Sequence, residues 1–152
     1  MAQLPTYTVT GSARIDAAPQ RIYDIIRDYN VGHPSILPKQ FSNFRVEAGG
    51  VGAGTTIRFD VKVLGQTQHY KAVVSEPEPG RVLVERNVEP NDSVTTFFVA
   101  PENGGRAAIV RIETEMKQRP GIGGKIERFL IEKALPPMYA QELKNLSARL
   151  AG

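Results

Sequence analysis

The feature that most constrains the fold is a series of short segments in which apolar and polar residues alternate. Such alternation is typical of half-buried strands. Turn signals separate the segments at Gly65, at 76–80, at 89–93 and at the hairpin pair Asn103-Gly104. Successive strands joined by short turns form an antiparallel meander. We therefore expect six strands, near residues 42–48, 55–64, 67–75, 81–88, 94–100 and 106–117.

A further strand and short helices precede this meander. Residues 7–15 alternate as a strand. Residues 17–30 carry Pro19 in a first helical turn and apolar residues at helical spacing, which predicts a short amphipathic helix. Two prolines in the segment VGHPSILP limit any second helix there to a turn or two.

A long helix is predicted near 122–150, after the last strand. Its apolar residues share one broad face, which comprises Ile126, Phe129, Leu130, Ala134, Met138, Leu143, Leu146 and Leu150. Pro136 and Pro137 remove two backbone donors from this helix. They predict a kink or a one-turn interruption at 133–137, with the two parts remaining one element.

Length and composition indicate one domain that spans residues 1–152. The net charge of +3 is spread along the chain, which argues against nucleic-acid binding. The absence of cysteine excludes disulfides and thiolate chemistry. Apolar runs are too short for a membrane span, and the start of the sequence has no signal-peptide pattern. We therefore expect a soluble, cytoplasmic protein.

A glycine-rich stretch, GGVGAGT at 49–55, raises the question of a phosphate-binding loop. A dinucleotide fingerprint requires a helix after the loop, whose N-terminus meets the pyrophosphate. Here the loop leads into the alternating segment TTIRFDVKV, which is a strand pattern, and the glycine spacing also differs from the fingerprint. The segment GIGGK at 121–125 lacks the Walker pattern. We interpret both as connections between elements.

The order of these elements resembles the START-like helix-grip superfamily (SRPBCC), in particular its polyketide cyclase/dehydrase type. The resemblance covers nearly the whole chain and is carried by four segments: ARIDAAPQRIYDIIRDY, FRVEAGGVGAGTTIRF, VVSEPEPGRVLVER and IERFLIEKALPPMYAQELKNLSARL. It implies an α+β fold in which a curved, seven-stranded antiparallel sheet wraps around the long C-terminal helix, with two short helices between the first two strands. It also implies a cavity for a hydrophobic ligand between the sheet and the long helix.

Few residues suggest chemistry. His33 lies in the segment that resembles the cavity mouth of helix-grip proteins, and an imidazole there can move a proton near neutral pH; the alternative is a helix cap or a solvated side chain. His69 is expected on the outer face of its strand, and Tyr70 on the inner face. Glu85 and Arg86 must point to opposite faces of one strand, and the alternation leaves open which of them faces inward. The catalytic candidates are His33, Tyr70 and Arg86.

The side chains expected to touch a ligand are mostly aromatic or aliphatic, with one acid among them. They are Phe41, Phe44, Phe59, Tyr70, Glu85, Phe98, Ile112, Phe129 and Met138. Each of the apolar members also suits an ordinary core position. The chain has no zinc or calcium motif, so we expect no metal and no cofactor.

Three functions fit these observations. The first is binding of a hydrophobic small molecule, such as a lipid, an isoprenoid or a polyketide-like compound. The second is an enzyme of the polyketide cyclase or dehydratase kind, which holds its substrate in the same cavity and orients it for proton transfer. The third is a protein-interaction module. The sequence identifies neither the ligand nor the oligomeric state.

Overall fold

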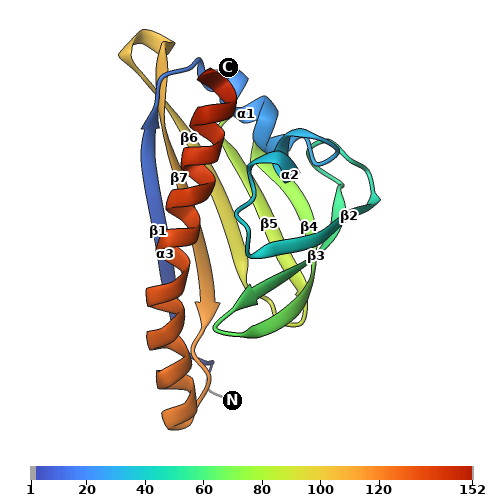
Figure 1. Cartoon of the computed structure of the whole chain (residues 1–152), viewed down its shortest axis with the longest axis vertical. Helices are drawn as coiled ribbons and strands as arrows, with labels where there is room; N and C mark the ends of the chain where they lie inside the picture. Colours follow the sequence, from blue (N-terminus) through green and yellow to red (C-terminus); the bar gives the residue numbers. More distant parts are fainter. Residues whose placement is uncertain (1–2, 152) are drawn as a thin grey trace.

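The computed structural model describes residues 3–151 and shows a single antiparallel sheet, one long helix and two short helices (Figure 1). The strands are β1 (Thr6–Ile15), β2 (Phe41–Ala48), β3 (Thr56–Val63), β4 (Gln66–Glu78), β5 (Val82–Glu89), β6 (Val94–Glu102) and β7 (Ala107–Lys117). The helices are α1 (Pro19–Arg27), α2 (Gly32–Ile36) and α3 (Gly121–Ala151), with a short 3-10 turn, η1 (Asn103–Gly105), before β7. These elements confirm the predicted helix-grip fold.

The strand order is β1-β7-β6-β5-β4-β3-β2. Strands β2 to β7 form a meander, and β1 adds to it as an edge strand beside β7. β1 pairs with β7 from Thr6 opposite Lys117 to Ile15 opposite Ala108, without a register shift. Each pairing brings an inward residue of one strand beside an inward residue of the next. The inner faces therefore merge into one continuous apolar surface, to which Val9, Val74, Leu83, Val110 and Ile112 contribute.

The second half of α3 packs against this surface, and its approach depends on a glycine. Met138, Tyr139, Leu143 and Leu146 are buried there. A Cβ placed on Gly11, which points inward from β1, would lie 3.0 Å from the Cβ of Tyr139. That separation is tighter than ordinary van der Waals contact, so a side chain at Gly11 would push the helix away from the sheet.

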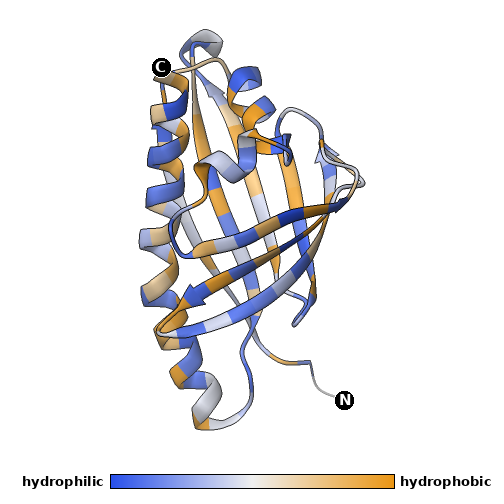
Figure 2. Ribbon diagram, turned by 45° about the vertical axis from the view of Figure 1, so that its right-hand side comes forward, coloured by the Kyte–Doolittle hydropathy of each residue, from blue (hydrophilic) through white to orange (hydrophobic). Residues whose placement is uncertain are grey.

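The first half of α3 departs from the expectation of one continuous buried face. Ile126, Phe129 and Leu130 are exposed, with Phe129 58% accessible. Figure 2 shows hydrophobic residues in the turns of α3 near its N-terminal end, which extend beyond the body of the sheet. These three residues lie outside the helical face that carries Met138 and Leu146, whereas Ile131, Ala134 and Leu135, which share that face, line the space next to the sheet.

Of the expected kink or one-turn interruption at 133–137, the interruption does not occur: α3 continues as one helix through Pro136 and Pro137. The two prolines leave the carbonyls of Glu132 and Lys133 without their usual donors. Both of these residues are exposed, so water can satisfy the carbonyls. The cost of the prolines is therefore smaller than it would be in a buried helix.

The short helices α1 and α2 cover one end of the space between α3 and the sheet. Ile22, Tyr23 and Ile26 of α1 are fully buried, as are Tyr29 and Ile36 nearby. Asn145 of α3 donates from Nδ2 to the carbonyl of Ile36 at 3.0 Å, which links the long helix to α2. This end of the molecule is therefore closed.

Candidate functional site

A cavity of about 250 Å³ lies between α3 and the concave face of the sheet. Most of its lining is apolar, and it includes a row of contacting rings in which Phe59 lies 5.5 Å from Phe41 and 5.3 Å from Tyr70, centroid to centroid. The end near Leu64, Gln66 and Gln68 is lined by exposed residues and opens to solvent. An adjoining hollow of about 330 Å³ shares part of this lining.

Most of the side chains expected to touch a ligand line this cavity. They are Phe41, Phe44, Phe59, Tyr70, Glu85, Ile112 and Met138. Two do not. Phe98 points to the other face of β6, where the guanidinium of Arg111 lies 4.1 Å from its ring centroid, and its neighbour Phe97 faces the cavity instead. Phe129 lies on the exposed side of α3, where Lys133 covers its ring.

The structure also decides between the two adjacent charges of β5. Glu85 faces the cavity and is buried, whereas Arg86 is exposed on the opposite face. Arg86 is therefore not placed to act on a molecule in the cavity. His69 is exposed on β4 with its Nδ1 2.7 Å from Oδ1 of Asp60, as expected for an outer-face residue.

His33 is not a solvated side chain, because it is 2% exposed and lines the cavity from α2, but it does cap a helix, since its ring bonds to a carbonyl in the last turn of α1. Its Nδ1 lies 2.7 Å from the carbonyl oxygen of Ile26 and must donate to it, since a carbonyl only accepts. The other ring nitrogen, Nε2, is 3.4 Å from Oε2 of Glu85. The ring of Tyr29 stacks on the imidazole at 4.5 Å.

Tyr29, Glu85 and His33 form one buried hydrogen-bonded group. The hydroxyl of Tyr29 donates to Oε2 of Glu85 at 2.6 Å. An imidazole nitrogen without hydrogen and a carboxylate oxygen both only accept. The contact between His33 and Glu85 is therefore favourable only with a proton on one of them. Burial of Tyr29, followed by the charge of Glu85, raises the pKa of the Tyr29 phenol well above its usual value.

A second carboxyl, Glu142 of α3, lines the cavity close to Glu85 and was not among the predicted residues. It is 5% exposed, and its Oε2 has no hydrogen-bond partner among residues 3–151. Burial first, and then the charge of Glu85, raise the pKa of Glu142 to about 8. A sequence signal for it exists: Glu142 falls on the same helical stripe as Met138 and Leu146, where an acid is out of place.

Hydroxyl groups complete this side of the cavity. The hydroxyl of Tyr139 is hydrogen-bonded to Oγ1 of Thr114, which in turn lies 2.9 Å from Oγ1 of Thr95. Burial raises the pKa of the Tyr139 phenol, and the nearby charges of Glu142 and Glu85 add to the effect. We refer to His33, Glu85, Thr114, Tyr139 and Glu142 together as the polar end of the cavity.

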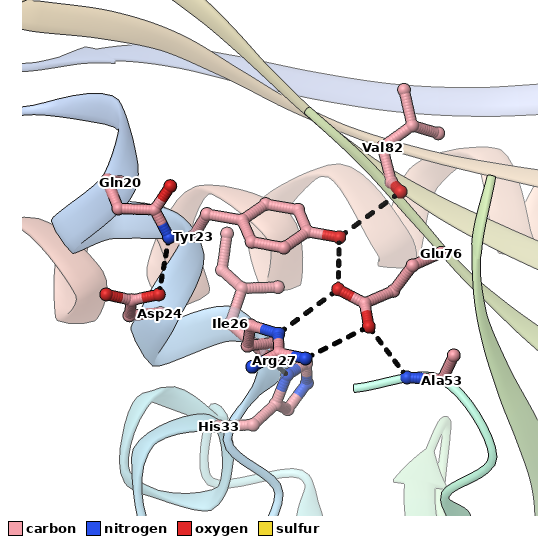
Figure 3. Close-up of polar contacts among 9 residues, drawn as sticks. All are labelled: Gln20, Tyr23, Asp24, Ile26, Arg27, His33, Ala53, Glu76 and Val82. Atoms are coloured by element: carbon pink, nitrogen blue, oxygen red, sulfur yellow. Dashed lines mark hydrogen bonds and ion pairs between the residues drawn. The ribbon is translucent and has the colours of Figure 1, made fainter. Parts of the chain in front are cut away.

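A third carboxyl, Glu76 of β4, lies outside the cavity in a fully paired environment (Figure 3). Arg27 donates to it from Nε at 3.1 Å and from Nη2 at 3.2 Å, Tyr23 donates its hydroxyl at 2.8 Å, and the amide of Ala53 donates at 2.8 Å. These donors, Arg27 first, lower the pKa of Glu76 to about 2. The side chain is 6% exposed.

The glycine-rich loop at 49–55 belongs to this paired group and not to a phosphate site. It joins β2 to β3, with no helix behind it. A Cβ on Gly52, whose φ is +67°, would lie 2.2 Å from Oε1 of Glu76 and 2.3 Å from Nη2 of Arg27. The loop therefore needs glycine to lie flat over the ion pair. Its amide at Gly52 also donates to the carbonyl of Arg27 at 2.8 Å.

No helix within residues 3–151 is long and apolar enough to cross a membrane. Within the same residues, no group of three or more His, Cys, Asp or Glu side chains is arranged to hold a metal ion.

Comparison with known proteins places the chain among helix-grip proteins. Residues 6–151 match the family described as polyketide cyclase / dehydrase and lipid transport. The solution structure of KanY protein is 25% identical with a TM-score of 0.84, and each chain covers 100% of the other. Norcoclaurine synthase from Thalictrum flavum, solved as a point mutant with a transition-state analogue, is 18% identical with a TM-score of 0.77, covering 99% of this chain and 98% of its own.

A third similar structure is the Zhui aromatase/cyclase from a Streptomyces species, with 13% identity and a TM-score of 0.74. The alignment covers 95% of this chain and 93% of that protein. At this level of identity, the synthase and the aromatase/cyclase establish a shared fold only. A comparison with curated proteins gives no match.

Proposed function

The chain belongs to the polyketide cyclase/dehydrase and lipid transport family, and from that premise we propose that it binds a hydrophobic small molecule between α3 and the sheet. The ligand is of the lipid, isoprenoid or polyketide-like kind. The observation that carries this proposal is the cavity itself, which is lined mainly by apolar side chains and reaches solvent at one end. Such concave, mostly apolar sites with a few convergent polar groups are typical of ligand pockets.

The arrangement of the lining supports a ligand with two unlike ends. Phe41, Phe44, Phe59 and Tyr70 form an aromatic surface that suits an apolar body. The polar end lies beneath the closed end of the fold, where a polar group of the ligand would be shielded from water. A protein-interaction module needs no such cavity, so this geometry favours the small-molecule function over that alternative.

A pair of tryptophan variants tests the proposal, because the native chain contains no tryptophan. Leu135→Trp places the indole in the cavity wall, whereas Leu130→Trp places it on the exposed side of the same helix. We expect the neutral fluorescent probe N-phenyl-1-naphthylamine to bind the native protein and the Leu130→Trp variant equally. Leu135→Trp should weaken binding by about tenfold or more, since the indole fills space that the probe needs. Equal binding by both variants would show that the cavity is not the site.

A second candidate function, a cyclase or dehydratase enzyme, is favoured by the Glu85 and Glu142 pair. Two carboxyls in one buried site differ in proton affinity, which allows one to act as an acid while the other acts as a base. Glu142, with a pKa of about 8, holds its proton at neutral pH at the buried end of the cavity. The test is turnover of a thioester-linked poly-β-ketone, with loss of product formation in Glu142→Gln and unchanged turnover in Glu132→Gln.

A further inference from the structure

The ionisable side chains that the described chain contributes to the cavity include two acids, Glu85 and Glu142, and no Lys or Arg. The other titratable groups on its wall are His33 from α2, Tyr70 from β4 and Tyr139 from α3, while Tyr29 reaches Glu85 from behind. The nearest cations of the adjoining hollow are paired, since Lys117 lies 2.6 Å from Asp92 and Arg119 lies 3.6 Å from Glu127.

Most hydrogen-bond donors of the polar end are engaged within the protein. Tyr29 donates to Glu85, and the Nδ1 of His33 donates to the carbonyl of Ile26. The hydroxyls of Tyr139 and Thr114 are bonded to each other. Oε2 of Glu142 remains as a buried acceptor that no described residue supplies with a donor. A buried acceptor without a partner carries an unrecovered desolvation cost, which a ligand donor would relieve.

We propose that the polar end of the cavity binds the ammonium group of an amphiphilic amine, with Glu142 as its counter-ion and the apolar body of the amine against the aromatic lining. This inference rests on the proposed ligand-binding function and specifies the class of ligand. An ammonium group offers several donors and a positive charge, so it satisfies Oε2 of Glu142 and reduces the repulsion between Glu142 and Glu85.

Other head groups fit less well. A carboxylate head, as in a fatty acid, would bring a negative charge next to two acids at a site that no Lys or Arg of residues 3–151 lines. A hydroxyl head offers one donor and leaves the repulsion between the two acids unchanged. A buried ammonium group is costly only when it is unpaired, and here a carboxyl lies at the place where the charge would lie.

Binding of an ammonium group must also expel a proton. Glu142 has a pKa of about 8, so at pH 7 it is mostly protonated and must ionise to pair with the ligand. The affinity for the amine should therefore rise as pH rises from 6.5 to 8, by at most about tenfold per pH unit for one proton released. The affinity for a neutral alcohol should change little over the same range.

The experiment uses three ligands that share one apolar body: 4-phenylbutylamine, 4-phenylbutanol and 4-phenylbutanoate. Isothermal titration calorimetry on the full chain, in buffers of different ionisation enthalpy, gives both affinity and protons released. We expect the amine to bind about tenfold or more tightly than the alcohol, because hydrogen bonds to charged groups are stronger than neutral ones. The carboxylate should bind weakest, and only the amine should release close to one proton at pH 7.

Two variants assign the effect to Glu142. Glu142→Gln keeps the shape of the side chain but removes its charge and its proton, so the amine should lose both its preference and its proton release while the alcohol still binds. Glu132→Gln changes an exposed acid of the same helix that lies outside the cavity, and it should behave as the native protein. Alcohol binding by Glu142→Gln also verifies that the variant is folded.

The outcomes separate the two proposals. If the alcohol or the carboxylate binds as tightly as the amine, or if Glu142→Gln keeps the amine preference, the amine inference is wrong and the ligand-binding function stands. If none of the three binds although the naphthylamine probe does, the amine inference is again wrong. If the probe itself binds Leu135→Trp and the native protein equally, the ligand-binding function fails and the amine inference fails with it.

Discussion

Glu76 and Glu142 are both almost fully buried acids, yet their surroundings are opposite. Glu76 receives four donors, from Arg27, Tyr23 and the amide of Ala53. Glu142 has an unpartnered oxygen and another acid nearby. The pKa falls to about 2 for the first and rises to about 8 for the second. Burial alone therefore does not determine the charge of an acid; the available donors do.

The difference separates a structural site from a candidate binding site. The Glu76 group connects α1, the glycine-rich loop and β4, and both carboxyl oxygens of Glu76 are hydrogen-bonded within the fold. The Glu142 group leaves a polar atom unsatisfied at the wall of a cavity, which the fold alone does not require. Buried groups with displaced pKa values and spare bonding capacity are common at functional sites.

Removing the Glu76 carboxyl should produce the largest effect. Glu76→Ala leaves the guanidinium of Arg27, the hydroxyl of Tyr23 and the amide of Ala53 without their acceptor. We expect a loss of about 3 kcal/mol in the free energy of unfolding at pH 7, measured by urea denaturation. Glu78→Ala, at an exposed position of the same strand, should change stability by less than about 0.5 kcal/mol. Similar losses in both variants would show that the Glu76 group adds no specific stability.

Glu142 should show the reverse behaviour. Its pKa rises from 4.5 in the unfolded chain to about 8 in the folded protein, so the folded state binds the proton more tightly. The stability of the native protein therefore falls as pH rises from 4.5 through 8. Glu142→Gln cannot ionise, so its stability relative to the native protein should already rise by about 2 kcal/mol between pH 4.5 and 6.5. A constant difference between the variants from pH 4.5 to 8.5 would contradict the raised pKa.

The same linkage gives Glu76 an effect at low pH. Its folded-state pKa of about 2 lies below the unfolded value of 4.5, so its contribution is complete above pH 4.5 and is lost as pH falls toward 2. Glu76→Gln should remove about 1.5 kcal/mol of the decrease in stability between pH 4.5 and 3. Urea titrations at several pH values would measure it. If Glu76→Gln and the native protein lose the same stability as pH falls below 4.5, other carboxyls account for the acid sensitivity.

The sequence predicted the fold because its signals are local. Turn residues and alternation placed all seven strands, and the chain order of the elements then left few ways to cover the apolar faces. The same signals were insufficient for the orientation of single residues. Phe97 and Phe98 are adjacent and equally apolar, as Glu85 and Arg86 are adjacent and equally charged, so alternation cannot tell which of each pair faces inward.

The candidate site was predicted in part for a related reason. Phe129 is nine residues before Met138 on α3, which places it on the opposite face of the helix, where it is exposed. The residues of the polar end come from α2, β5, β7 and α3, which are distant in the sequence. Glu142 was detectable as an acid on an apolar stripe, but its relation to Glu85, 57 positions earlier in the chain, appears only once the fold brings the two together.

The smallest expected difference compares two tyrosines that each donate to a buried acid. Tyr23 gives its hydroxyl to Glu76 at 2.8 Å, and Tyr29 gives its hydroxyl to Glu85 at 2.6 Å. In Tyr23→Phe, Glu76 keeps Arg27 and the amide of Ala53, so little of its charge loses stabilisation. In Tyr29→Phe, Glu85 keeps only the longer contact with His33 at 3.4 Å. Each phenylalanine keeps the ring and its packing, so the hydroxyl is the sole change.

We therefore expect Tyr29→Phe to lower the free energy of unfolding more than Tyr23→Phe, by about 1 kcal/mol at pH 7. Parallel urea denaturation of the two variants and the native protein gives this difference directly. The hydroxyl of Tyr23 also contacts the carbonyl of Val82 at 3.3 Å. Tyr23→Phe should therefore also lower the free energy of unfolding, but by less than Tyr29→Phe. A larger loss of stability in Tyr23→Phe would contradict this expectation. It would mean that the remaining donors to Glu76 do not compensate for the lost hydroxyl.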